Sequence, residues 1–313
     1  MNKPSLNDLR HVGEGFLMGS ADIVPGVSGG TVALIVGIYE RLVGAISRFD
    51  AHAARLLTTR KWREFAEWID LRFLIALGAG ILTGIASLAS LMHYLLEHQR
   101  SYTLAVFFGL IAASSWLVAR MVQPRDARQK SVAWIAAIGA AFFAYWLVGL
   151  PQLQGGDSLL YFFACGLLAI CAMILPGISG AYILWMLGAY LPVTGIIKSA
   201  VHLEFTGRDL ATLTVFSAGC AVGLVGFAKL LRWLLARAHS LTMAVLGGFM
   251  LGSLRKMWPF QLPVATTEES SRMTQYANYL PESLGSHELT CLGLGLGALA
   301  IVLALEGWAA RRS

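Results

Sequence analysis

The sequence predicts an all-α polytopic membrane protein made of two inverted structural repeats, each with one re-entrant helical hairpin and three transmembrane helices. Three observations support this prediction. The 313 residues are 57% hydrophobic and only 13% charged, whereas soluble domains carry roughly 25% charged residues. Two glycine-rich, helix-breaking segments interrupt long apolar runs. The flanks of these two segments resemble each other at a constant displacement along the chain, which indicates a duplicated fold.

The net charge of +6 comes largely from basic residues in short loops between apolar segments. This distribution is the positive-inside pattern of membrane proteins, so we expect membrane lipids, and no nucleic acid, as partners. The four cysteines lie in apolar segments without a CxxC pair, which favours free buried thiols over a metal site. We expect neither a metal nor a cofactor. The N-terminal segment is polar up to Arg10 and shows no cleavable signal peptide.

The first predicted element is a re-entrant hairpin over residues 12–46, broken at a polar, glycine-rich turn. In that turn Pro25 lacks a backbone donor, and its glycines permit backbone angles that other residues avoid. The first arm has about a dozen residues, too few for a hydrocarbon core that requires ~20. Irregular backbone at membrane depth is tolerated only where protein covers it or where it lines a polar cavity.

The remaining elements follow from hydropathy and charge. A basic, amphipathic helix over residues 47–71 is expected to lie on an anionic membrane surface, with a solvated loop helix as the alternative. The first repeat, residues 1–157, is completed by spans over residues 72–96, 102–122 and 132–150. The second repeat, residues 158–313, contains a re-entrant hairpin over 158–197 and spans over 210–235, 241–257 and 289–309.

Two collinear matches support the duplication. The second broken segment, residues 175–182, repeats the first one 151 positions further along, from Pro25 to Pro176. Gly80 and Gly84 form a close-packing pair in the first repeat, and a similar pair, Gly219 and Gly223, follows 139 positions later. The smaller displacement fits the additional length of residues 47–71 in the first repeat.

Each repeat crosses the membrane an odd number of times, so the second repeat is inverted relative to the first. With both termini inside, the inner loops hold most of the basic residues, as the orientation rule requires. The outer loops hold most of the acids and a few cations, namely Arg100, Lys198, Arg208, Arg255, Lys256 and Arg272. If the broken segments crossed fully, the acidic loop 258–288 would lie inside. Residues 158–175 are long enough to cross, which leaves that alternative open.

The two broken segments are the candidate binding site. The first backbone N–H groups of a helix have no partner within that helix, and their positive potential suits an anion. A phosphate or carboxylate group fits this site better than a metal ion, because no carboxylate or histidine cluster accompanies it. The alternative is a glycine-rich packing kink. The candidate headgroup ligands are Gly26, Ser28, Gly29, Gly30, Thr31, Gly177, Ser179, Gly180, Tyr182, Arg41 and Lys229.

Asp22 is a candidate coupling residue. An acid at mid-bilayer costs about 2.5–3.5 kcal/mol on insertion scales and is therefore functional by default. The second repeat has Met173 at the equivalent position, so the site is asymmetric. Asp22 either carries a coupling proton, or pairs with a cation, or accepts hydrogen bonds from the turn. Arg41 has alternatives as well, because it can pair with Glu40 or extend to the lipid headgroups.

The first motif, Asp22-Ile23-Val24-Pro25-Gly26-Val27-Ser28-Gly29-Gly30-Thr31 followed by Tyr39-Glu40, resembles the signature of the bacterial polyprenyl-phosphate transporter family, formerly a domain of unknown function. The second motif, Pro176-Gly177-Ile178-Ser179-Gly180 with Tyr182, resembles that family's second motif. The resemblance covers nearly the whole chain. It implies a protein of the bacterial cytoplasmic membrane that returns undecaprenyl phosphate from the outer to the inner leaflet for reuse in cell-wall synthesis.

The expected function is therefore a lipid translocase without enzymatic activity. Its polyprenyl phosphate partner would bind at the two turns while the repeats rock around it. A channel or carrier for a small soluble anion is one alternative. A phosphatase acting on lipid pyrophosphate is a weaker one, because it needs a nucleophile or base and Asp22 is the only acid near either turn. The coupling ion and the presence of a homo-oligomer are left open.

Overall fold

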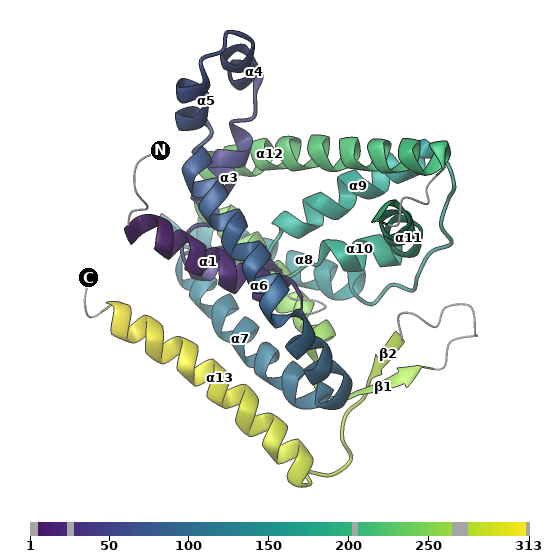
Figure 1. Ribbon diagram of the computed structural model, residues 1–313. Coiled ribbons are helices and arrows are strands. Elements are labelled where there is room, and N and C mark those ends of the chain that lie inside the picture. The colour runs from purple at the N-terminus through teal and green to yellow at the C-terminus, as the bar shows by residue number, and fades with distance from the viewer. Residues whose placement is uncertain (1–5, 24–27, 202–205, 265–274, 311–313) are drawn as a thin grey trace.

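The computed structural model describes residues 6–23, 28–201, 206–264 and 275–310 (Figure 1). Most of them are helical, and the prediction of an all-α polytopic membrane protein is confirmed. Five helices in the described residues, α6, α7, α8, α12 and α13, are long and apolar enough to cross a membrane. The helices are α1 (Leu6–Asp22), α2 (Gly29–Ile35), α3 (Tyr39–Ser47), α4 (Ala51–Thr58), α5 (Trp62–Trp68), α6 (Leu71–His98), α7 (Arg100–Arg120), α8 (Ala127–Leu147), α9 (Leu159–Ile174), α10 (Gly180–Met186), α11 (Tyr190–Val201), α12 (Gly207–Ser253), η1 (Leu254–Met257) and α13 (Ser286–Ala310).

The long polar loop before α13 contains an antiparallel ribbon that the sequence did not predict. Its strands are β1 (Gln261–Val264) and β2 (Gln275–Asn278), and Gln261 pairs with Asn278. Leu262 and Pro263, on the first strand, are exposed. This ribbon lies at one side of the helical body (Figure 1).

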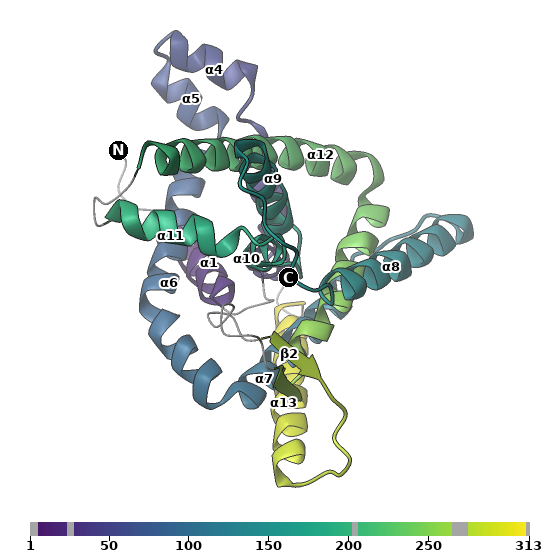
Figure 2. The ribbon, with the colours of Figure 1, turned by 90° about the vertical axis from the view of Figure 1, so that its right-hand side faces the viewer.

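The segment predicted as one amphipathic helix over residues 47–71 is two short helices, α4 and α5. Asp50 caps α4 by accepting a hydrogen bond from the Ala53 amide. The chain then turns at Arg60, whose φ of 57° lies in the left-handed region, and a helix cannot continue through such a residue. The α4–α5 pair projects from one end of the molecule (Figures 1 and 2).

The first broken segment enters and leaves at the same end of α6. Helix α1 runs in the same direction as α6: Arg72 donates to Asp8 at the start of both helices, and Gly84, about halfway along α6, packs against Phe16. Helices α2 and α3 then turn back, with a 120° bend between them. Arg41 of α3 thereby reaches Asp70, the residue before α6.

The second broken segment repeats these contacts. Gly219 of α12 packs against Phe163 of α9, as Gly80 of α6 packs against Val12 of α1. The bend between α10 and α11 is 108°. At the end of α10 the carbonyl of Leu187 accepts a hydrogen bond from the Tyr161 hydroxyl near the start of α9, so this segment also returns to its point of entry.

Both bends depend on a glycine in the left-handed region. Gly37 has a φ of +78° and Gly188 a φ of +73°, and side chains rarely tolerate such angles. The two glycines are again 151 positions apart.

The predicted spans 210–235 and 241–257 correspond to two helical arms of α12, which are separated by a kink. Ala238 between them has non-helical angles, φ −143° and ψ 53°, and the helix bends there (Figure 2). No loop intervenes, because alanine and its neighbours favour helix. The first arm packs on α9, and the second arm packs on α8, where Gly248 lies against the carbonyl of Ala137.

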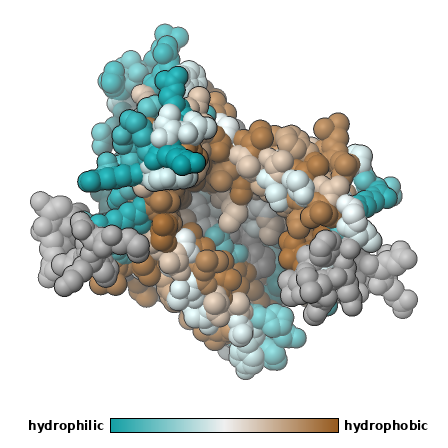
Figure 3. Space-filling view, turned by 45° about the horizontal axis from the view of Figure 1, so that its top comes forward, coloured by the Kyte–Doolittle hydropathy of each residue, from teal (hydrophilic) through white to brown (hydrophobic). Residues whose placement is uncertain are grey.

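The last helices are exchanged between the two predicted repeats. Helix α7 packs on α13, with Gly109 against the carbonyl of Gly295, while the second arm of α12 packs on α8. Apolar side chains cover much of the remaining surface, and hydrophilic ones gather at upper left (Figure 3). On α8, for example, Phe142 is 73% exposed. This surface suits a hydrocarbon solvent.

Candidate functional site

The two broken segments meet inside the molecule. The Ser28 hydroxyl donates to the Met173 carbonyl at 3.1 Å, and the Gly177 amide donates to Thr31 Oγ1 at 2.9 Å. Tyr39 donates to the carbonyl of Ile174 at 3.1 Å. Ser28, Thr31 and Tyr39 are all buried. These three hydrogen bonds join residues that are far apart in sequence, and together they brace one turn against the other.

Several backbone donors in the described residues of the two turns are engaged within the chain. The Gly29 amide donates to Asp22 Oδ1 at 2.5 Å, and the Gly30 amide donates to Ser28 Oγ at 3.1 Å. In the second turn the Tyr182 amide donates to Ser179 Oγ at 3.4 Å. Helices α2 and α10 are also only seven residues long, so their summed dipoles are small. Additional positive charge for an anion must therefore come from side chains.

A large cavity lies beside the two turns. Its volume is about 1190 Å³, and it is lined from the turns by Asp22, Ile23, Ser179, Ala181 and Tyr182. The other walls come from the ends of α6 and α8, the start of α7, η1 and the β1–β2 ribbon. Ligand sites in membrane transporters are typically formed at such broken helices.

Three cations line this cavity: Arg100, Arg255 and Lys256. Hereafter they are called the cation cluster. The Arg100 guanidinium lies 3.5 Å from the centre of the Tyr276 ring, and its Nη2 donates to Gln261 Oε1 at 3.2 Å. Its Nε is buried and has no hydrogen-bond partner in the described part of the chain. A buried donor without a partner costs about 1–3 kcal/mol, which an incoming acceptor would recover.

The other two cations are also placed by aromatic residues. Arg255 Nη1 donates to the Tyr145 carbonyl at 2.9 Å, and the guanidinium lies 4.4 Å from that residue's ring centre. Lys256 Nζ lies 4.5 Å from the centre of the Tyr182 ring. Aromatic rings attract cations through their negative faces without neutralising them.

In the described part of the chain, few acids lie near the cation cluster. The acidic residues that line the cavity are Asp22 and Glu97, and Glu97 pairs with His93 at 3.6 Å. Within the described ranges, none of the three cations forms an ion pair with a carboxylate. Among the described residues that line it, the cavity therefore has a surplus of positive charge.

Comparison with known proteins identifies the family. Residues 18–275 match the family model described as undecaprenyl phosphate translocase-like. A protein named polyprenyl-phosphate transporter from Vibrio cholerae serotype O1 is 36% identical over 97% of this chain and 98% of its own length. Another of the same name, from Staphylococcus aureus strain NCTC 8325, is 31% identical over 79% of this chain and 84% of its own. No solved structure gives a significant match.

The chain belongs to the undecaprenyl phosphate translocase-like family. The names of that family and of its relatives identify a transporter and not an enzyme. As a member of this family, the chain is a multi-pass membrane protein whose apolar helices match that role.

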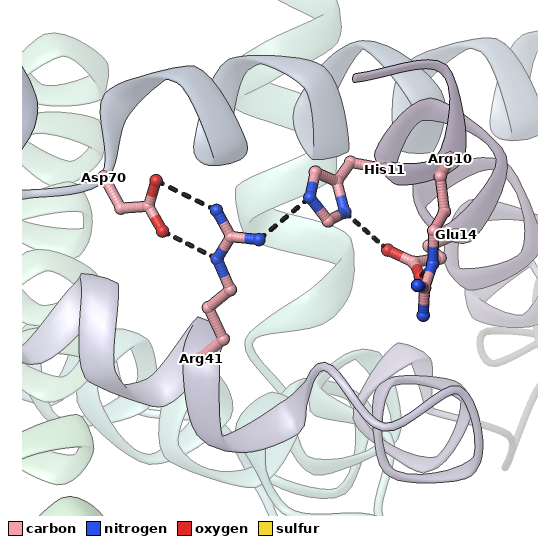
Figure 4. Close-up of polar contacts among 5 residues, drawn as sticks. All are labelled: Arg10, His11, Glu14, Arg41 and Asp70. Atoms are coloured by element: carbon pink, nitrogen blue, oxygen red, sulfur yellow. Dashed lines mark hydrogen bonds and ion pairs between the residues drawn. The ribbon is translucent and has the colours of Figure 1, made fainter. Parts of the chain in front are cut away.

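Two predicted headgroup ligands lie away from the cavity of this family member. Arg41 donates from Nε to Asp70 at 2.7 Å and contacts His11 Nε2 at 2.9 Å (Figure 4). His11 in turn contacts Glu14 at 2.7 Å. Arg41 thus joins α3 to α1 and α6.

Lys229 is exposed on α12. The Ala53 amide and, to a smaller extent, Lys229 lower the pKa of the Asp50 carboxyl. Lys229 therefore lies near the α3–α4 turn and not among the residues that line the cavity.

The other predicted residues are at or beneath the turns. Ser179, Tyr182 and Asp22 line the cavity, whereas Gly26 lies outside the described residues. Gly30 and the hydrogen bond between Thr31 and Gly177 join the two turns, whereas Gly29 packs against Asp22 and Gly180 against Ala169 of α9. At Gly30 an added Cβ would lie 2.7 Å from the Ile174 carbonyl oxygen, so only glycine allows this approach.

Sequence reasoning missed the role of the cation cluster. It placed Arg100, Arg255 and Lys256 in outer loops, because each lies at the end of an apolar span. A signal was present: these three cations lie on the predicted outer side, against the positive-inside pattern. Exceptions to that pattern are candidates for a functional role.

Proposed function

We propose that this transporter carries undecaprenyl phosphate, or a related polyprenyl phosphate, between the leaflets of the bacterial cytoplasmic membrane and binds its phosphate in the cavity. The observation that supports the proposal most is the cation cluster beside the two turns, which forms no ion pair with the described carboxylates. The names of the relatives supply the substrate class.

The chemistry of the cluster suits a lipid phosphate. Phosphate esters carry about −1.5 to −2 charges near neutral pH and three strong acceptor oxygens. Guanidinium groups bind such oxygens in pairs, and an ammonium adds a compact point charge. The unpartnered Nε of Arg100 is one donor available to the phosphate. Leu96, Val148 and Leu150 give the cavity an apolar portion, and the isoprenoid chain can remain there or in the bilayer.

The predicted ligands Ser179 and Tyr182 keep their role in this proposal, because both line the cavity. The glycines of the turns act indirectly, by letting the two turns approach each other. Arg41 and Lys229 are not needed for the headgroup in this arrangement.

We also propose that the chain consists of two inverted repeats with re-entrant hairpins. The support is the residue-by-residue correspondence of the α1–α6 and α9–α12 contacts and of the two glycine bends. Transport would then proceed by rocking of the repeats around the braced turns.

In the predicted orientation, with both termini cytoplasmic, the cavity opens to the outer side. Its walls come from the α6–α7 corner, the end of α8 and the β1–β2 ribbon, all of which belong to predicted outer loops. The proposed starting point is therefore a lipid headgroup in the outer leaflet.

The test is transport by the purified protein in liposomes that contain a fluorescent polyprenyl phosphate. The Arg255→Gln and Lys256→Gln variants are each expected to transport about 10- to 100-fold more slowly, because a hydrogen bond to a charged group contributes about 1.5–3 kcal/mol. Arg63→Gln is the matched control, since Arg63 is 92% exposed on α5.

The same liposomes distinguish the alternative, a carrier for a small soluble anion. Uptake of inorganic phosphate without movement of the lipid would contradict the proposal. Lipid transfer that is equally fast in wild type and in both cluster variants would exclude the cavity as the headgroup site.

A further inference from the structure

A narrow groove runs along the second arm of α12, between α7 and α8. Its volume is about 190 Å³, and none of the cavity residues belongs to it. Its floor consists of small residues of α12, including Ala244, Gly247 and Gly248, and its walls are mostly apolar. Such a shape and lining suit a hydrocarbon chain and not a polar solute.

The groove and the cavity lie at opposite ends of α7. Arg100, the first residue of α7, lines the cavity, whereas Ser115 and Ala119 near its other end line the groove. A helix rises 1.5 Å per residue, so the 21 residues of α7 extend about 30 Å. That length matches the hydrocarbon core of a bilayer, which places the two sites near opposite membrane faces.

Positive charge surrounds one end of the groove. Lys130 and Trp134, both in the first two turns of α8, line it. Arg125 and Arg128 lie in the same turn region and are exposed. Within the described residues, none of these three cations forms an ion pair. Tryptophan is typical of the membrane interface, so this end suits the anionic head of a lipid.

Gly247 is one of the small residues that leave the groove open. Gly247 corresponds to Phe108 at the displacement of 139 that relates the two predicted repeats. The Phe108 ring packs against Trp258, with their centres 5.9 Å apart. At Gly247 an added Cβ would find its nearest neighbour, Val118 Cγ1, at 3.4 Å, which is ordinary contact. The smaller residue leaves space that its counterpart fills.

We infer that this groove holds the isoprenoid chain of the transported lipid in the leaflet opposite the cavity, with its phosphate beside Lys130. The inference rests on the proposed function and adds a second binding site for the same substrate. A single narrow groove fits a one-chain lipid better than a phospholipid, which brings two chains. The transporter thus offers the lipid one site in each leaflet.

The experiment uses a diazirine-bearing polyprenyl phosphate in phosphatidylcholine vesicles that contain the full-length protein. After photolysis, labelled peptides are mapped by mass spectrometry. Labelling is expected at the end of α7 and in the first turns of α8, as well as around the cavity. In the Gly247→Phe variant, groove labelling is expected to fall about tenfold. Excluding even two methylene groups of the lipid from an apolar site lowers its affinity by about that factor.

Gly139→Phe on α8 is the matched control, because Gly139 has open space around it and does not line the groove. Lys130→Gln is expected to weaken groove labelling while cavity labelling persists. Thermal unfolding of each variant shows whether it is folded.

The outcomes separate the inference from the proposed function. Cavity labelling without groove labelling would overturn the inference and leave the proposed function standing. An absence of labelling at both sites would overturn both. Competition by phosphatidylglycerol that removes groove labelling but not cavity labelling would identify bulk phospholipid as the occupant, and would also overturn the inference.

Discussion

Gly149, just after α8, leaves room for the Arg255 guanidinium because it has no side chain. A Cβ at this residue would occupy the place of the Arg255 guanidinium. The hydrogen bond from Arg255 to the Tyr145 carbonyl would then be lost. An added Cβ at position 149 would meet only the end of the flexible Arg255 side chain and no backbone. The fold can therefore accommodate the substitution, whereas Arg255 has to leave its place in the cation cluster.

Gly149→Ala is therefore expected to slow lipid transport about tenfold or more, because hydrogen bonds to charged groups are worth about 1.5–3 kcal/mol. The melting temperature should hardly change. Transport in liposomes and thermal unfolding in detergent measure the two effects. Gly139→Ala, which meets nothing within 4 Å, is the control. Normal transport by Gly149→Ala would show that the position of Arg255 is unimportant.

Asp22 is the second residue whose replacement tests the proposed function. Its carboxylate faces the cavity and accepts the Gly29 amide. We expect Asp22→Asn to keep that hydrogen bond through its amide oxygen but to reduce the pH dependence of the transport rate, because the exchangeable proton of Asp22 is gone. Rates measured across mildly acidic to mildly alkaline pH test this, with Glu97→Gln as the control. A variant that still responds to pH like the wild type would remove the proton role.

At the scale of elements, the brace between the two broken segments holds the site together. Thr31 accepts the Gly177 amide, and Tyr39 donates to the Ile174 carbonyl. Both contacts are between α2–α3 and the turn after α9. A buried polar group that loses its partner costs about 1–3 kcal/mol.

Thr31→Val is accordingly expected to lower the free energy of unfolding by about 1–3 kcal/mol, because it preserves shape and leaves the Gly177 amide unpaired. Denaturant or thermal unfolding in detergent measures the loss. Thr214→Val is the control, since Thr214 is exposed and its hydroxyl donates within its own helix. If Thr31→Val and Thr214→Val lowered the free energy of unfolding equally, the contacts between the two turns would not contribute to stability. A double variant with Tyr39→Phe would report whether the contacts are coupled.

The sequence predicted the broken segments because proline and glycine interrupt apolar runs. It could not predict that they touch, because Thr31 and Gly177 are joined only in the folded chain. The turn at Arg60 was missed since arginine seldom adopts a positive φ. Hydropathy marked the two arms of α12 as two spans, but it could not show that they are joined directly by a kink at Ala238. The cation cluster comes from two segments, the start of α7 and η1, that meet only in three dimensions.

At the scale of the whole molecule, the predicted orientation places the cavity outside and the α4–α5 pair inside. Cysteines at positions 152 and 280 are expected to react with a membrane-impermeant maleimide on intact cells, whereas a cysteine at position 63 should react only after lysis. Leu280 and Arg63 are 78% and 92% exposed, so accessibility within the fold does not limit labelling. Labelling of position 63, but not of positions 152 and 280, on intact cells would show the reverse orientation. Equal labelling of all three positions on intact cells would contradict the predicted orientation.

The exchange of last helices has a consequence for biogenesis. Gly109 of α7 finds its packing partner on α13, which leaves the ribosome well after α7. Until then the glycine face of α7 has to be sheltered by lipid or by the insertion machinery. A chain truncated before residue 286 should therefore enter the membrane but present an unfinished surface to quality-control proteases.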